Sequence, residues 1–252
     1  MNYAFHAELI RLRRPRVLVS AAAPALAFAL AASLAVVLSA GGDPTAVADL
    51  EGSGGGTAAF AVGASFTGIL VFVLFIATIA TEFSQGTFRT LLLRQPRRLA
   101  LLAGKMGALL AFAAGVLAVA LVGAFVVSLA LAPSQDVATG AWLSGEGLGA
   151  AAGDYARVLA GWAAWGTLGM ALAVLVRSVP IALGIGIAWS GPFEHLIADV
   201  WTAAEDWFPG LLLEDLAAGG EATLRTGLVV AVYLALAGGA AALTLRRRDV
   251  VG

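Results

Sequence analysis

The sequence predicts an all-α integral membrane protein that crosses the bilayer six times, with both termini in the cytoplasm. Three observations support this: the composition, the apolar runs and the order of the charges. Hydrophobic residues make up 60% of the 252 residues, charged residues make up 12%, and the mean hydropathy is +0.93. A soluble domain carries roughly a quarter charged residues. The composition is therefore typical of a membrane protein.

The apolar runs fall into six segments separated by charged residues. A helix needs about 20 apolar residues to cross a hydrocarbon core about 30 Å thick. We expect spans at approximately 17–39, 60–81, 104–132, 156–176, 179–193 and 225–245. They take up over half of the chain, so we expect a single transmembrane domain, 1–252, and no separate soluble catalytic domain.

The charges alternate between basic and acidic intervals along the chain. The basic residues cluster before the first span, between spans two and three, between spans four and five, and after the sixth. Because Lys and Arg are retained on the cytoplasmic side, this order predicts the topology. Only Arg157 and Arg225 depart from it, each at the outer edge of a predicted span. We expect the following residues to anchor the chain to anionic lipid: Arg11, Arg13, Arg14, Arg97, Arg98, Lys105, Arg246, Arg247 and Arg248.

Two segments near the N-terminus lie outside the predicted spans. Residues 2–16 predict an amphipathic helix on the membrane surface, with Phe5, Leu9 and Leu12 on one face. The loop 40–59 is rich in Gly, so we expect it to be flexible and unstructured.

The fourth and fifth spans are joined by only four residues, 177–180, which predicts an antiparallel hairpin. Pro180 suits a first helical turn, where its missing N–H costs nothing. Gly191-Pro192 is expected to interrupt the fifth span. We interpret 191–222, with its Trp and acidic residues, as a cap at the outer leaflet that is either interfacial or re-entrant.

The segment 81–98 connects spans two and three and predicts a short cytoplasmic helix that ends at Pro96. Glu82 is acidic and gains nothing from anionic lipid, which favours contact with a partner protein. Gly86 is expected inside the helix, where a Gly costs roughly 1 kcal/mol relative to Ala. Close approach of a partner backbone would explain Gly86. Phe83, Phe88 and Leu91 are expected to fill a groove of that partner. The predicted coupling interface comprises Glu82, Phe83, Gln85, Gly86, Thr87, Arg89 and Thr90.

This segment resembles the first intracellular loop of ABC transporter permeases of the type-2 exporter class. That loop reads Glu-x-x-x-Gly-Thr, then Arg and Leu residues, a Pro, basic residues and a Lys. The matching positions here are Glu82, Gly86, Thr87, Arg89, Leu91, Leu92, Pro96, Arg97, Arg98 and Lys105. The resemblance extends over the whole chain, through the entry helix, the six spans and the segment before the last span.

The resemblance implies that two such permeases pair, as a homodimer or a heterodimer, and that each binds a separate ATPase subunit through the loop helix. ATP and Mg would be bound by that ATPase, and the cargo would be a peptide, drug or lipid-like molecule. In such permeases the second and fifth spans line the substrate path. The resemblance is carried over by span and not by motif. The residues that it places near the path are Phe66, Thr67, Phe72, Phe75, Trp189 and Ser190. From the residues alone, helix packing is the favoured interpretation of the second-span aromatics.

Several activities are excluded by residues that the chain lacks. It has no cysteine and no phosphate-binding loop, since Gly104-Lys105 is followed by Met106. No metal-ligand spacing occurs, and the near-neutral net charge gives no reason to expect nucleic-acid binding. The chain itself is therefore predicted not to be an enzyme and to hold no cofactor.

Two alternatives remain open beside the exporter. An ion-coupled transporter usually places ionisable groups inside the membrane. Here the interiors of the predicted spans lack them, and Glu82 and Glu194 are expected at span edges, which favours energy supplied from outside the bilayer. An intramembrane hydrolase would need Ser190 and His195 in contact together with an oxyanion donor. Gly191-Pro192 separates the two residues, which makes this alternative the weaker one.

Overall fold

The computed structural model describes residues 2–94, 96–218 and 223–247, and within these ranges every regular element is helical. Five helices are long and apolar enough to cross a membrane, or six if α4 and α5 form one bent span. The all-helical class is thus confirmed for the described residues, and the long apolar helices are compatible with a multi-pass membrane protein; six spans and their sidedness stay predictions. The α-helices are α1 (Asn2–Leu12), α2 (Pro15–Ala40), α3 (Pro44–Glu51), α4 (Gly55–Phe66), α5 (Gly68–Ser84), α6 (Thr87–Arg94), α7 (Arg98–Leu131), α8 (Gly145–Val176), α9 (Val179–Ala188), α10 (Glu194–Val200), α11 (Pro209–Ala218) and α12 (Leu224–Arg247).

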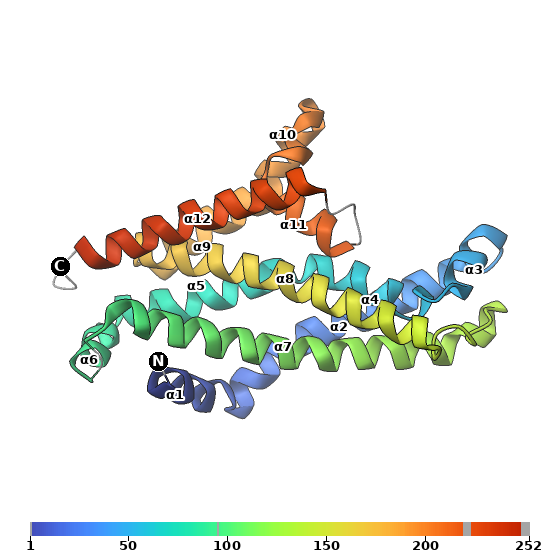
Figure 1. Ribbon diagram of the computed structural model, residues 1–252, viewed down its shortest axis with the longest axis horizontal. Helices are drawn as coiled ribbons and strands as arrows, with labels where there is room; N and C mark the ends of the chain where they lie inside the picture. Colours follow the sequence, from blue (N-terminus) through green and yellow to red (C-terminus); the bar gives the residue numbers. More distant parts are fainter. Residues whose placement is uncertain (1, 95, 219–222, 248–252) are drawn as a thin grey trace.

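The long helices run side by side along the longest axis of the molecule (Figure 1). α1, α6 and the C-terminal end of α12 lie at one end, whereas α3 and the α7–α8 connection lie at the other. At 1.5 Å per residue, α7 is about 50 Å long and exceeds the hydrocarbon core. The two ends of the bundle therefore extend beyond the apolar layer that the helices can cross.

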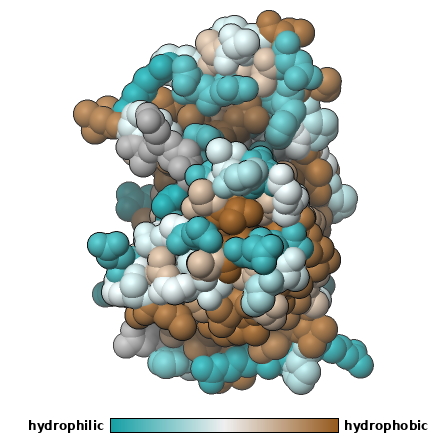
Figure 2. Space-filling view, turned by 90° about the vertical axis from the view of Figure 1, so that its right-hand side faces the viewer, coloured by the Kyte–Doolittle hydropathy of each residue, from teal (hydrophilic) through white to brown (hydrophobic). Residues whose placement is uncertain are grey.

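The flanks of the bundle are apolar where no helix covers them. On α12, Leu228, Val232 and Leu236 recur at helical spacing and are each more than half exposed. Figure 2 looks onto the end that carries α3, where hydrophilic and intermediate residues surround a small hydrophobic patch near the centre, and a hydrophobic band crosses the lower part of the face. A polar end and apolar flanks are what a lipid-embedded bundle requires.

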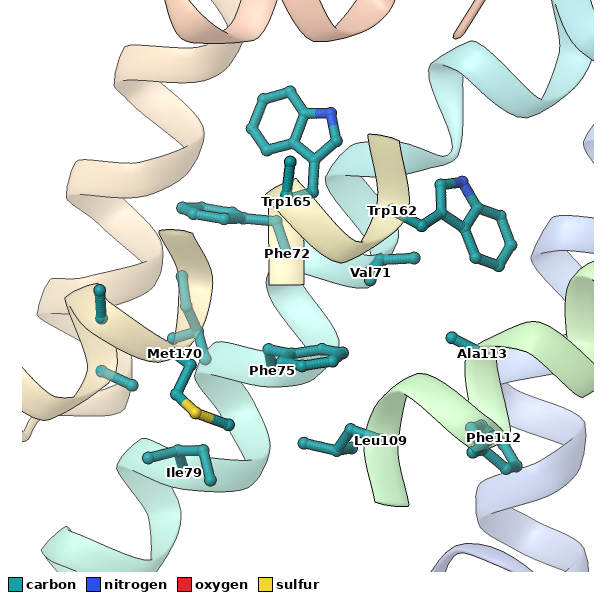
Figure 3. Close-up of a cluster of buried hydrophobic side chains, with 14 of the residues drawn as sticks. Val71, Phe72, Phe75, Ile79, Leu109, Phe112, Ala113, Trp162, Trp165 and Met170 are labelled. Atoms are coloured by element: carbon teal, nitrogen blue, oxygen red, sulfur yellow. The ribbon is translucent and has the colours of Figure 1, made fainter. Parts of the chain in front are cut away.

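The core is densest between α5 and α8, which pack more extensively than any other pair. Phe72 and Phe75 project from α5 toward α8 (Figure 3). A Cβ added at Gly166 would lie 2.8 Å from the Phe75 ring, and one at Gly169 would lie 2.7 Å from the Phe72 carbonyl oxygen. The two glycines thus allow the aromatic helix to approach closely, and the packing interpretation of these aromatics is confirmed.

The prediction of an unstructured loop over 40–59 is wrong, because this segment holds α3 and the start of α4. Asp43 caps α3 by accepting the backbone N–H of Thr45 at 2.9 Å. These hydrogen bonds, the Thr45 hydroxyl first among them, hold the pKa of Asp43 below its ordinary value. A Cβ at Gly56 would lie 2.6 Å from the Phe125 ring, so glycine here permits packing.

The second predicted span is divided into α4 and α5, which meet at Thr67 with a bend of 43°. The Thr67 hydroxyl donates to the Ala64 carbonyl at 2.7 Å, inside the bend. α4 begins at Gly55, five residues before the expected start of the span. The predicted span over 60–81 therefore corresponds to a bent pair of helices that together are long and apolar enough to cross a membrane.

The predicted interruption at Gly191-Pro192 is also wrong. Residues Trp189–Phe193 form a π-helical turn that joins α9 to α10, and Val179–Val200 is one candidate span. A wider turn accommodates Pro192, which has no N–H to donate. α10 then projects away from the bundle (Figure 1), and α11 packs back on α4 and α8.

Candidate functional site

The elbow, residues 81–94, comprises the end of α5, a turn and α6. Gly86 lies in the turn with φ of 69°, outside both helices. Nothing lies within 4 Å of a Cβ built there. The expectation that Gly86 lies inside a helix is therefore wrong, and the left-handed turn explains the glycine without a partner backbone. The short helix predicted for this segment is α6, which ends at Arg94, before Pro96; its coupling role stays a prediction.

The predicted coupling residues divide into two groups. Glu82 is buried and Phe83 is half-buried. The exposed group comprises Gln85, Gly86, Thr87, Arg89 and Thr90. Only this second group presents a surface to a partner, whereas Glu82 and Phe83 support the elbow from within.

The aromatic part of the elbow is internal. Phe88 is fully buried and stacks on Phe83, with ring centroids 4.3 Å apart. The guanidinium of Arg177 lies 5.3 Å from the centroid of the Phe83 ring. The expectation that Phe88 fills a partner's groove is therefore wrong, and Leu93, 87% exposed, is the apolar side chain on the surface of α6. These rings connect α6 to the α8–α9 hairpin.

Glu82 belongs to a buried ion-pair network that also contains Glu8, Arg11 and Lys105. The Lys105 ammonium donates to Glu82 Oε1 at 2.5 Å and also to Glu8 Oε2. Arg11 Nη1 donates to Glu82 Oε1 at 3.1 Å. Glu8, Glu82 and Lys105 are each at most 5% exposed. Through Glu82, which lies at the start of the elbow, the network joins α5 to α1 and α7.

Sequence analysis placed Lys105 at the lipid boundary, but its ammonium is enclosed by protein. Glu8 was missed. Ala4, Glu8 and Leu12 form the buried face of α1, which packs on α7. The expected face of Phe5, Leu9 and Leu12 shares only Leu12 with it. The available signal was one acidic residue, four positions from Ala4 and from Leu12, in a helix that contains one Arg and is followed by three more.

The remaining predicted anchors lie at the same end of the bundle. Arg98 Nη1 donates to the Leu245 carbonyl at 2.8 Å and so joins α7 to the end of α12. Arg97, Arg98 and Arg246 line a shallow cavity. Arg13, Arg14 and Arg247 are exposed, and Arg248 lies outside the described residues. Lipid anchoring by this basic surface stays a prediction.

A second site is the aromatic cavity, of about 310 Å³, between α5, α8, α9, α11 and α12. Its distinctive residue is Glu194, which is fully buried. Glu194 Oε2 accepts the backbone N–H of Leu211 at 3.0 Å, whereas Oε1 has no hydrogen-bond partner. Glu194 is the first residue of α10, within the candidate span Val179–Val200, and its expected place at a span edge stays a prediction.

The predicted substrate-path residues are only partly brought together. Phe72, Trp189 and Ser190 line the aromatic cavity. Thr67 lines a separate apolar cavity between α2, α5 and α7, and Phe66 lines a third one near α11. Phe75 is fully buried in the core. A path through the second and fifth spans stays a prediction, with three of its six residues at one cavity.

The geometry gives no support to hydrolysis. The Ser190 hydroxyl donates to the Gly186 carbonyl at 2.7 Å, and His195 Nδ1 contacts the Gly191 carbonyl. His195 Nε2 lies 3.5 Å from Glu214, whose pKa is raised by burial and lowered in part by His195. Among the described residues, no group of three or more His, Cys, Asp or Glu could hold a metal ion.

Comparison with known proteins finds no matching family model, no similar curated protein and no similar solved structure. Function is therefore inferred from the chain's own residues: an exposed helix supported by a buried ion-pair network at one end, and an aromatic cavity with a buried carboxylate.

Proposed function

We propose that this chain is the membrane subunit of an ATP-driven exporter of the type-2 ABC class, located in the cytoplasmic membrane. It would pair with a second permease and bind two copies of a separate ATPase. The observation that carries the proposal is the elbow. α6 is a short helix at one end of the bundle whose polar face is exposed, while the turn before it and its apolar face are fixed by the protein itself.

A coupling helix must pass a push from the ATPase to the spans. Two connections fit this task. Phe88 packs on Phe83, which lies under Arg177 at the turn between α8 and α9. On the other side, Glu82 is paired with Lys105 of α7 and Arg11 of α1. A displacement of α6 would therefore be resisted by α1 and α7 and transmitted to the α8–α9 hairpin.

The proposal is tested by reversing a charge on the exposed face of α6. Arg89→Glu is introduced into the chain, which is co-expressed with the soluble ATPase that carries a phosphate-binding loop. We expect the amount of ATPase co-purified in nanodiscs to fall about tenfold or more, because a reversed interface charge meets like charge on the partner. The spans remain inserted, since Arg89 makes no buried contact.

The matched control is Arg16→Glu, which makes the same charge change at an exposed position at the start of α2. It is expected to leave the co-purified ATPase unchanged. Equal retention of the ATPase by wild type and Arg89→Glu would refute docking through α6. The absence of any ATPase that binds the wild-type chain would refute the exporter.

A second candidate, ion-coupled transport, is favoured by the buried carboxylates of Glu8, Glu82 and Glu194. Such groups mark ion pathways in many transporters. Two of the three, however, are paired with Lys105, which suits a structural role. Solute uptake into liposomes driven by a proton or sodium gradient, without an ATPase, would favour this candidate over the exporter.

A further inference from the structure

We propose that the aromatic cavity binds a lipophilic organic cation, with Glu194 as its counter-charge. The inference rests on the proposed function only in treating this ligand as the exported cargo. Binding itself is a property of the chain alone.

The lining of the cavity is aromatic and apolar apart from one charge. Phe72, Trp165, Trp189 and Tyr233 line the cavity together with Glu194, and among its described lining residues none is Lys, Arg or His. A cation over the face of an aromatic ring is attracted by the ring quadrupole, most strongly when it is desolvated. Ligand sites are typically apolar with a few placed polar groups. The lining has both features.

The carboxylate of Glu194 is only half satisfied. Its Oε2 is held at the start of α11, where a Cβ added at Gly210 would lie 2.3 Å from it. Its Oε1 has no hydrogen-bond partner, although the residue is 0% exposed. Buried polar groups almost always have partners, so one without a partner requires an explanation. A positive ligand in the adjoining cavity supplies the missing partner.

The chemistry of the lining selects an organic cation over a metal ion. Calcium takes six to eight oxygen ligands, and Mg²⁺ demands near-octahedral oxygen coordination. Here the other side-chain oxygens in the described lining are the Ser190 hydroxyl, which already donates to Gly186, and the Tyr233 hydroxyl, too few for such coordination. A quaternary ammonium, a phosphonium or a protonated amine with apolar substituents needs one negative charge and aromatic faces, both of which are present.

The test is equilibrium binding of tetraphenylphosphonium to the full chain in nanodiscs of phosphatidylglycerol, which offers no competing ammonium headgroup. Empty nanodiscs give the lipid background. We expect saturable binding of the phosphonium and none of the neutral analogue triphenylphosphine oxide. Equal binding of the two compounds would overturn the role of charge at this site.

Two variants locate the site. Glu194→Gln removes the charge but keeps an oxygen to accept the Leu211 N–H, and it is expected to weaken phosphonium binding about tenfold or more. The matched control is Glu214→Gln, which neutralises a partly buried carboxylate that lies on α11 and faces His195 instead. It is expected to leave binding unchanged. Unchanged binding in Glu194→Gln would overturn the proposal. Trp189→Leu, which removes an aromatic face from the cavity lining, is expected to weaken binding and gives a second test. None of these outcomes bears on docking through α6.

Discussion

Two regions of this molecule bury carboxylates, and they do so in opposite ways. In the ion-pair network, Glu8 and Glu82 share the ammonium of Lys105, and Arg11 adds a second positive charge. In the aromatic cavity, Glu194 has the start of α11 on one side and no counter-charge on the other. The first region holds its own counter-charges, although Glu8 Oε1 and Glu82 Oε2 also lack hydrogen-bond partners. For Glu194, the described part of the chain supplies no counter-charge.

We interpret this difference as one of role: the ion-pair network supports the fold, and the aromatic cavity is the proposed binding site. Removing one partner of a buried ion pair leaves an uncompensated charge, so a complete network stabilises one arrangement of α1, α5 and α7. A carboxylate without a counter-charge costs stability in the free protein and regains it when a cation binds. Under the two proposals, the network supports the coupling helix and the Glu194 carboxylate awaits a ligand.

The largest expected effect comes from breaking the network. Lys105→Met keeps the length of the side chain but leaves Glu8 and Glu82 buried with Arg11 alone. We expect the free energy of unfolding to fall by roughly 3–5 kcal/mol, the usual cost of removing one partner of a buried pair. The measurement is the thermal melting midpoint of the purified chain in detergent, with Arg13→Met, at an exposed position on the same end, as the control.

The double variant Glu82→Gln with Lys105→Met extends this test. If the two residues are coupled, removing both charges costs less than the sum of the single changes. Additive losses, or a Lys105→Met protein as stable as the Arg13→Met control, would show that the network does not hold the three helices together.

Much of the fold could be predicted from the sequence because long apolar runs have few alternatives in a membrane. The α8–α9 hairpin and the placement of Pro180 in the first turn of α9 are confirmed. The failures occur where tertiary contacts override local composition. Gly56 serves packing against Phe125 instead of flexibility. Gly191-Pro192 widens a helix without ending it.

The sites were harder to predict, because a charge at the edge of an apolar run reads as a surface residue. Lys105 and Glu82 are 23 positions apart, and their pairing depends on how α5 packs beside α7. Glu194 reads as part of an amphipathic outer helix, and its burial follows from α11 folding back over it. In both cases the missing information is long-range packing, which has no periodic signal in the sequence.

Glu194→Gln is expected to raise the free energy of unfolding, whereas Lys105→Met lowers it, and the change is expected to be smaller. Gln keeps an acceptor for the Leu211 N–H and removes a buried charge that lacks a counter-charge. That burial costs about 1–3 kcal/mol, while the helix N-terminus returns 0.3–1 kcal/mol, so we expect a net gain of about 1 kcal/mol in the ligand-free protein. Melting midpoints with Glu82→Gln alongside give the comparison, since that variant is expected to lose stability. Loss of stability in both variants would mean that Glu194 is as well compensated as Glu82.

The smallest expected effect on stability comes from Gly→Ala substitutions in the backbone turns of the two regions. Gly86 has φ of 69° in the elbow, whereas Gly191 lies in the π-helical turn beside the cavity with helical backbone and open space around it. Gly86→Ala should therefore cost about 1 kcal/mol, because a side chain is disfavoured in the left-handed region, while Gly191→Ala should cost nothing. Gly86→Asn, which tolerates that region better, is expected to lose less than Gly86→Ala. Melting midpoints measured side by side decide the matter: equal losses at 86 and 191 would mean that the elbow turn is no more constrained than the cavity turn, and α6 would then lack the rigid connection that coupling requires.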